Sequence, residues 1–126
     1  MKYLSDYMQD RQTALFEKTN TFFAFSQEQF DKKKKPGIKY TSCGQGMICE
    51  SRYVKELKEG LDLIYKESII QDLKENGKVG VITRELHNHE AGYTMEIDQT
   101  VDKLEDYPIT TEEIFNVFKS IDWSNY

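Results

Sequence analysis

The sequence predicts an α+β fold, a single compact domain over residues 1–126 in which four or more helices surround a small antiparallel sheet. Its 126 residues fit one domain and are enough for a core without disulfides or metal. Apolar residues recur at helical spacing in several separate stretches. Between residues 21 and 49, aromatic and β-branched residues instead form short runs that favour strands.

The densest aromatic stretch, residues 21–30, combines a strand with the start of a helix. Residues 21–25 favour a short strand, because bulky aromatic side chains pack well on a pleated surface. Ser26 is a typical helix N-cap, and Gln29 follows it at capping-box spacing. We expect four phenylalanines around this corner to start one core: Phe22, Phe23, Phe25 and Phe30.

The first half of the chain predicts two helices and a hairpin. Apolar residues at helical spacing place the first helix over residues 5–18, and a second helix stops at Pro36-Gly37. Residues 38–42 and 47–49 have period-two, β-favouring character and are separated by a glycine turn. Together with residues 21–25 they predict a three-stranded sheet.

The second half predicts mainly helix. Ser51 caps a third helix over residues 52–65, and helical character continues to a stop at Asn76-Gly77. Residues 79–97 fit either a β-hairpin or a helix that ends near Gly92; we prefer the helix, followed by an extended segment.

The last part of the chain predicts a short helical turn over residues 100–104 and a final helix. That helix opens with a capping box in which Thr110 is the N-cap and Glu113 occupies the third helical position.

Charge is distributed unevenly along the chain. Residues 31–58 carry eight basic and three acidic side chains, net +5, whereas residues 59–126 carry six basic and fifteen acidic ones, net −9. No run approaches the roughly 20 apolar residues of a membrane span, and the N-terminus lacks the apolar stretch of a signal peptide. We therefore expect a cytoplasmic protein of the host cell, with no membrane contact and with reduced cysteines.

His87-Asn88-His89-Glu90 is the one cluster of residues typical of catalytic or metal sites. On a helix His87 and His89 point about 200° apart and would not share a metal; on a strand they would face the same side. Cys43 and Cys49 match no zinc spacing with these histidines and are expected to be small buried thiols. We expect no catalytic residue, no metal and no cofactor, and therefore no enzyme.

A basic segment beside a tyrosine is a candidate nucleic-acid contact. Clustered lysines neutralise phosphates, and an aromatic ring offers a base a stacking surface. The candidate residues are Lys32, Lys33, Lys34, Lys35, Lys39 and Tyr40.

Two motifs carry a resemblance to a known family. Phe22–Phe30 reads F-F-A-F-S-x-E-Q-F, and Glu85–Glu90 reads E-L-x-N-H-E. Over residues 20–120 the chain resembles small uncharacterised proteins of phages and mobile elements. The resemblance carries no activity, but implies that His89 and Glu90 matter more than His87. In context these proteins are similar to anti-CRISPR inhibitors, which bind host nucleases without catalysis.

These observations lead to one main functional hypothesis. We expect a phage-type binding protein that antagonises host defence, an anti-CRISPR inhibitor of a nuclease effector or of its guide-RNA complex. Its acidic face would occupy a basic nucleic-acid channel. The residues expected on this face are Glu59, Asp62, Glu67, Asp72, Glu75, Asp102, Glu105, Asp106, Glu112 and Glu113.

Three alternatives remain at this point. One is a nucleic-acid-binding regulator that uses the basic segment, with RNA as a possible partner. The second is a metal-dependent hydrolase that uses His89 and Glu90, and the third is a structural phage protein. The sequence does not indicate an oligomeric state.

Overall fold

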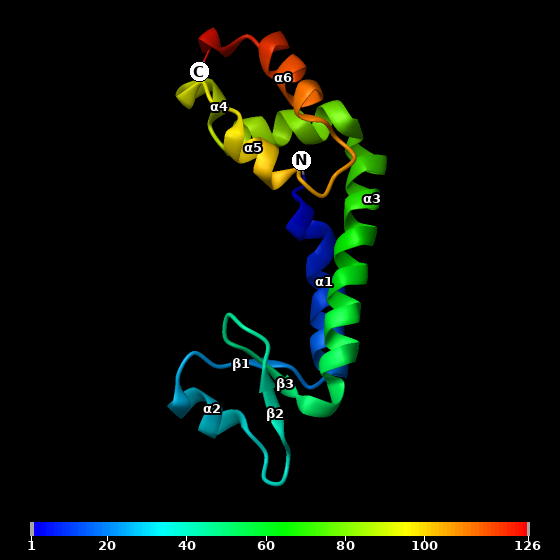
Figure 1. Cartoon of the computed structure of the whole chain (residues 1–126), viewed down its shortest axis with the longest axis vertical. Helices are drawn as coiled ribbons and strands as arrows, with labels where there is room; N and C mark the ends of the chain where they lie inside the picture. The colour runs from blue at the N-terminus through cyan, green and yellow to red at the C-terminus, as the bar shows by residue number, and fades with distance from the viewer. Residues whose placement is uncertain (1, 126) are drawn as a thin grey trace. The chain divides into compact units, whose positions relative to one another are not determined.

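The computed structural model describes residues 2–125, which form six α-helices and a three-stranded antiparallel sheet (Figure 1). The predicted α+β class is confirmed. Backbone contacts divide the chain into an N-terminal unit, residues 5–68, and a C-terminal unit, residues 2–4 with 69–125. Each unit is described by itself, and the single domain expected over residues 1–126 stays a prediction.

The elements have the following bounds. The helices are α1 (Leu4–Lys18), α2 (Gln27–Lys33), α3 (Val54–Asn88), α4 (Ala91–Thr94), α5 (Asp98–Lys103) and α6 (Thr111–Ser120). The strands are β1 (Phe22–Phe23), β2 (Tyr40–Ser42) and β3 (Met47–Glu50), and 3-10 turns cover Ser51–Tyr53 and Trp123–Asn125. Within residues 2–125, no helix has both the length and the apolar character needed to cross a bilayer.

The predicted three-stranded sheet is confirmed in the N-terminal unit, and its strand order is β1-β3-β2. Phe22 lies opposite Ile48, and Thr41 lies opposite Cys49. The turn between β2 and β3 contains Gly44 and Gly46, both with φ near 80–90°. This left-handed backbone is accessible to glycine at little cost, so the pair of glycines permits the tight hairpin.

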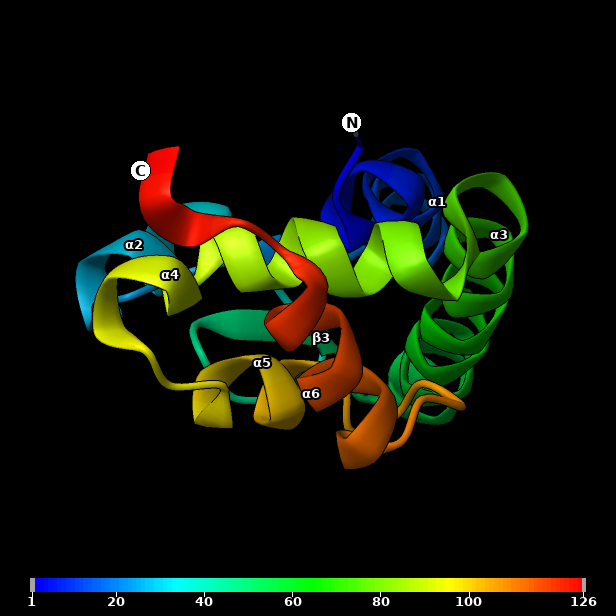
Figure 2. The same ribbon diagram turned by 90° about the horizontal axis from the view of Figure 1, so that it is seen from above.

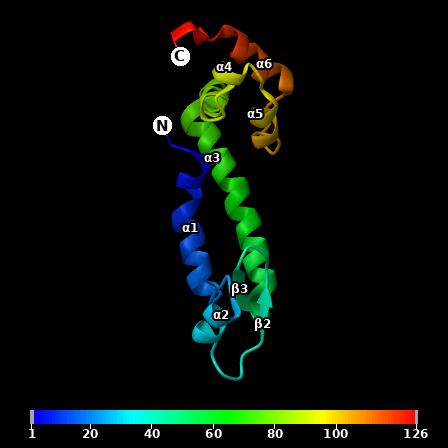
Figure 3. The same cartoon turned by 90° about the vertical axis from the view of Figure 1, so that its left-hand side faces the viewer.

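Helix α1 runs alongside the first part of α3 in the same unit (Figure 3). Leu15 packs on Gly60, where a Cβ atom would come within 2.7 Å of the Leu15 Cδ2 atom. Two ion pairs connect the helices: Arg11 with Glu67 at 3.3 Å and Lys18 with Glu56 at 2.9 Å. Together they fix the antiparallel direction of α1 and α3. The glycine inside α3 therefore makes room for α1.

The aromatic corner differs from the expected core. Ser26 does cap α2, because its side chain accepts the N–H of Gln29. However, Phe25 is 74% exposed and Phe23 is 37% exposed. Only Phe22 and Phe30 form a half-buried cluster, in which both rings pack against the ring of Tyr40. The expectation that all four phenylalanines share one core was wrong, since the two-residue strand is too short to bury both of its faces.

The C-terminal unit combines the second part of α3 with α5 and α6 (Figure 2). Its buried apolar residues lie on α3, directly after α5 and on α6: Val81, Ile82, Leu86, Leu104 and Ile114. Gly77 (φ 70°, ψ 164°) interrupts α3 where the stop at Asn76-Gly77 was predicted. For residues 79–97 we preferred a helix to a β-hairpin, and the helix is confirmed as far as Asn88.

Some predicted details of the second half need correction. Residues 93–97 do not form an extended segment, because Tyr93 and Thr94 belong to α4, Met95 is left-handed and Ile97 lies near the helical region. The third helix begins at Val54 and not at residue 52, and its predicted continuation to the break at Gly77 is confirmed. Ser51 does not cap it, because the Ser51 hydroxyl hydrogen-bonds the Thr41 hydroxyl at 2.8 Å across the hairpin.

The capping box of α6 gives a direct test of the fold. Thr110 accepts the Glu113 N–H at 3.1 Å, and the Glu113 carboxylate accepts the Thr110 N–H at 2.9 Å. We expect Thr110→Ala to lower the free energy of unfolding by about 1 kcal/mol. Urea denaturation measures this value. Thr111→Ala, one residue inside the helix, serves as the control, and an equal loss in both variants would contradict the capping role.

Candidate functional site

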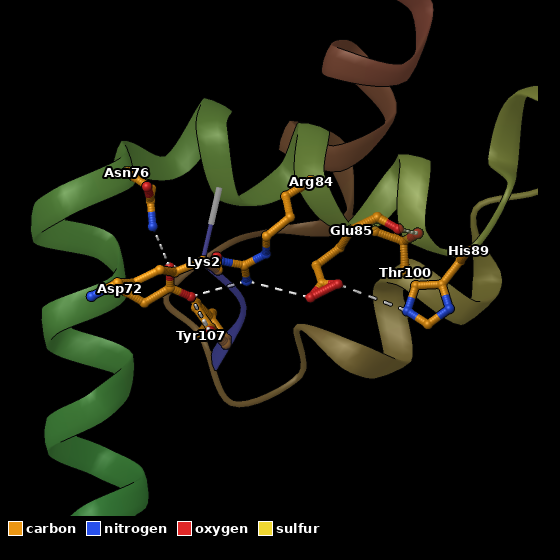
Figure 4. A network of polar contacts seen from close by, with 8 residues as sticks. All are labelled: Lys2, Asp72, Asn76, Arg84, Glu85, His89, Thr100 and Tyr107. Carbon is orange, nitrogen blue, oxygen red and sulfur yellow. Dashed lines mark hydrogen bonds and ion pairs between the residues drawn. The ribbon is translucent and has the colours of Figure 1, made fainter. Parts of the chain in front are cut away.

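The C-terminal unit is built around a buried ion pair between two parts of α3. Arg84 Nη1 donates to Asp72 Oδ1 at 2.7 Å, and Arg84 Nη2 donates to Asp72 Oδ2 at 3.0 Å (Figure 4). Both side chains are at most 2% exposed. A bidentate arginine–carboxylate pair of this kind is among the strongest polar contacts available in a protein.

Other segments add hydrogen bonds to the pair, although the buried Arg84 Nε has no partner among the described residues. Tyr107, in the loop before α6, donates its hydroxyl to Asp72 at 2.6 Å, and the Asn76 amide donates at 2.8 Å. Arg84 also donates to the backbone carbonyl of Lys2 at 3.1 Å. The buried carboxylate thus accepts four hydrogen bonds, which satisfies both of its oxygens.

These contacts hold the groups in fixed protonation states. Burial opposes ionisation of Asp72, but hydrogen bonds from Arg84, Tyr107 and Asn76 outweigh it and lower the pKa of Asp72 below 3.8. Burial and the bond to Asp72 both raise the pKa of Tyr107. Because no proton in this group is poised to move near neutral pH, the network is suited to structure and not to acid–base catalysis.

Glu85 and His89 extend the network along the same helix. The Glu85 carboxylate is 1% exposed; one oxygen accepts from Arg84 at 3.3 Å and the other lies 4.0 Å from His89 Nε2. Thr100, on α5, donates its hydroxyl to the Glu85 carbonyl at 3.4 Å. His89 therefore faces the buried network, as Figure 4 shows.

His87 and Glu90 belong to a different environment. Both line a pocket of about 430 Å³ together with Gly92, Tyr93 and Trp123. The helix thus directs His87 and His89 to different surroundings, as predicted for a helical segment. It also separates His89 from Glu90, so the pair implied by the resemblance does not form one site.

The described residues also give no support to a thiol or metal site elsewhere. Between residues 2 and 125, no group of three His, Cys, Asp or Glu side chains is arranged to hold a metal ion. The Sγ atoms of Cys43 and Cys49 lie 3.8 Å apart. Burial, aided by the Cys43 thiol, raises the pKa of Cys49 to about 11, which disfavours the nucleophilic thiolate.

The basic segment is largely engaged within the N-terminal unit. Lys32 pairs with Glu28, Lys34 pairs with Asp31, and Lys33 donates to the Phe23 carbonyl. The ring of Tyr40 packs in the aromatic cluster, and its hydroxyl accepts the Lys35 N–H at 2.9 Å. Tyr40 is half-buried, so part of the ring expected to stack on a base is covered by Phe22 and Phe30. Lys35 and Lys39 extend exposed side chains for which the described part of the chain shows no ion pair.

The predicted acidic face divides into three groups. In the N-terminal unit Glu59, Asp62 and Glu67 are exposed but each lies in an ion pair. Asp72 is buried, so its place on an exposed face was wrong, and Glu113 is used by the α6 cap and by Lys78. In the C-terminal unit the remaining members of the face are exposed: Glu75, Asp102, Glu105, Asp106 and Glu112.

A comparison with known proteins identifies the family of the chain. The model of a family of unknown function (DUF7659) matches residues 4–121. The chain belongs to this family. No curated protein and no solved structure shows significant similarity to it. The match covers both units and all six helices of this DUF7659 protein.

Sequence reasoning missed the network that organises the C-terminal unit of this DUF7659 chain. Its partners Arg84 and Tyr107 were not singled out, and Glu85 was named only as the first residue of the E-L-x-N-H-E motif. A signal was present, because Arg84 and Glu85 lie between the apolar residues 81–82 and Leu86. Charged residues inside an apolar helical stripe indicate buried, paired groups. The sequence did not show which partner each charge would find.

The lowered pKa of Asp72 predicts a pH-dependent contribution to stability. Asp72→Asn should lower the free energy of unfolding at neutral pH by about 3–5 kcal/mol, since it leaves Arg84 without its main buried partner. Because the folded-state pKa is lowered, the contribution of the carboxylate is present above about pH 4 and is lost as the pH falls through the folded value. The gap between wild type and variant should therefore shrink in acid.

Urea unfolding of both proteins between about pH 7 and pH 3 measures this gap. The control is Glu75→Gln, an exposed carboxylate on the same helix. A gap for Asp72→Asn that stays constant down to the acid limit would contradict the assigned ionisation.

Proposed function

We propose that this DUF7659 protein is a phage-type, non-enzymatic binding protein that antagonises host defence. It would occupy a basic nucleic-acid channel of a host protein, with a CRISPR nuclease effector as the intended partner. The surface that would make this contact is formed by the exposed carboxylates of the C-terminal unit. We name these residues the carboxylate surface: Glu75, Asp102, Glu105, Asp106 and Glu112.

The charge balance of the two units supports this proposal. The C-terminal unit has 12 acidic and 6 basic side chains, net −6, whereas the N-terminal unit has 10 and 11, net +1. Asp72, Glu85 and Arg84 are buried together. Outside this buried network, the C-terminal unit therefore has ten acidic and five basic side chains. Such an excess attracts a basic partner and accelerates its association.

The observation that carries the proposal is the state of Asp102, Glu105 and Glu112. All three are exposed, and the described residues offer them no ion pair. They lie on α5, in the following loop and in the first turn of α6, and these two helices pack on each other. Carboxylates left open on a packed, ordered scaffold are available to a cationic partner without first breaking internal pairs.

Two alternatives have less support. A nucleic-acid regulator would use the basic segment, but four of its six residues already make side-chain contacts within the unit. A hydrolase that uses His89 and Glu90 would need the two side chains at one site, whereas His89 lies beside Glu85 and Glu90 lines the pocket.

The test is a binding assay against a purified CRISPR nuclease effector, with and without its guide RNA, and with nuclease-treated samples. The test variant reverses the three open carboxylates: Asp102→Lys, Glu105→Lys and Glu112→Lys. At physiological salt, we expect binding at least about tenfold weaker in this variant, and wild-type binding that weakens steeply as salt rises.

The matched control reverses the two open cations of the basic segment, Lys35→Glu and Lys39→Glu. Binding to the effector should survive this change. If instead the lysine variant loses binding and nuclease treatment removes the partner, the nucleic-acid alternative is favoured. Unchanged binding in the carboxylate variant would refute the proposed contact surface.

A further inference from the structure

A pocket in the C-terminal unit joins three aromatic rings and one carboxylate. It has a volume of about 430 Å³ and is lined by His87, Glu90, Gly92, Tyr93 and Trp123. The residues come from the end of α3, from α4 and from the C-terminal 3-10 turn, which lies next to α4 (Figure 2). Pockets that bind small groups start at roughly 300 Å³, so this one can enclose a side chain or a small ligand.

The indole of Trp123 forms a fixed wall of the pocket. Its Nε1 donates to the Phe118 carbonyl at 3.1 Å, and its ring packs against the Phe118 ring at a centroid distance of 5.6 Å. A Cβ atom at Gly92 would lie 2.0 Å from the indole, so only glycine allows this approach. The His87 ring stands 5.2 Å from the indole centroid at 56°. The aromatic surface is therefore held in place by the fold.

The carboxylate and the third ring are set by the backbone around α4. Glu90 (φ 54°) and Met95 (φ 59°) both adopt the left-handed conformation and enclose this single helical turn. Residues other than glycine rarely adopt such a conformation. Between them, Tyr93 is 88% exposed. The turn places Glu90 and Tyr93 at the pocket with a large aromatic surface open to solvent.

Aromatic faces beside a carboxylate are suited to a cation. A cation over Trp or Tyr gains electrostatic attraction to the ring, and a planar guanidinium can also stack. The same guanidinium can donate two parallel hydrogen bonds to one carboxylate. The lining residues include one acid and no Lys or Arg, and the surrounding unit has a net charge of −6. An anionic ligand would be repelled by this site.

We infer that this pocket binds the guanidinium group of an arginine side chain supplied by a basic protein partner. The stacking surface is Trp123 with Tyr93, and Glu90 is the counter-ion. This inference rests on the proposed function, because it names the side chain that the acidic unit would capture from its partner. The arginine would anchor the complex, while the carboxylate surface steers its approach.

The experiment uses the tryptophan itself as the reporter. Trp123 is the sole tryptophan of the chain, so its fluorescence reports on the pocket without labelling. The probes are N-acetyl-arginine amide and N-acetyl-citrulline amide, which share shape but differ in charge. We expect saturable quenching or shift with the arginine probe, and at least about tenfold weaker binding of the citrulline probe.

Two variants localise the effect. Glu90→Gln keeps the shape of the side chain and removes its charge. It should weaken binding of the arginine probe by about tenfold. Tyr93→Ala removes an exposed ring, so it should also weaken the probe without unfolding the protein. Glu96→Gln changes an exposed carboxylate that does not line the pocket and should leave binding unchanged.

The outcomes separate the two proposals. Equal binding of both probes, no saturable signal, or unchanged affinity in Glu90→Gln would overturn the arginine pocket. If the arginine probe binds as expected while the effector assay fails, the pocket stands and the proposed function falls. If the effector binds through the carboxylate surface while the probe does not bind, only the pocket is rejected.

Discussion

The Arg84–Asp72 ion pair sets the constraint on which the C-terminal unit depends. Twelve residues along an uninterrupted α-helix span about 18 Å, far too much for a hydrogen bond of 2.7 Å. The pair can form only because Gly77 breaks α3 between the two residues, with a backbone conformation that favours glycine. Burying the guanidinium then draws in the Lys2 carbonyl and the carboxylate of Glu85. The same break and the same charge thus determine how several separate segments meet.

Burial of this network also shapes the outer electrostatics. A buried pair contributes less to stability than its distances suggest, because both charges lose hydration. Its burial also removes these charges from the surface that a binding partner contacts. Arg84 is the one arginine of the C-terminal unit, and it is neutralised internally. The basic side chains left at the surface of that unit are lysines. Because two carboxylates are buried with the one arginine, ten acidic and five basic side chains remain at the surface of the unit, and carboxylates still predominate there.

Apart from the three-stranded sheet, in which Phe22 pairs with Ile48, the predictions that succeeded rest on interactions within a few residues of one another. Ser26 and Thr110 cap their helices because a hydroxyl reaches an N–H three residues on. Gly77 ends a helical segment for an equally local reason. Predictions that failed needed tertiary information: Asp72 was assigned to a surface because its partner lies twelve residues away across the break. The pocket at Trp123 was missed for the same reason, since Trp123 and Gly92 meet only after folding.

The residue type at position 90 is not explained by the backbone conformation there. A glycine at this position would adopt φ 54° without steric cost, as Gly77 adopts φ 70° in the same unit. Gly92, by contrast, is needed by packing, because the indole occupies the space of a Cβ atom. The turn therefore has glycine where packing demands it and a carboxylate where the backbone alone would favour glycine. Neither the core nor the ion-pair network uses that carboxylate, which leaves the pocket as the place where its charge has an effect.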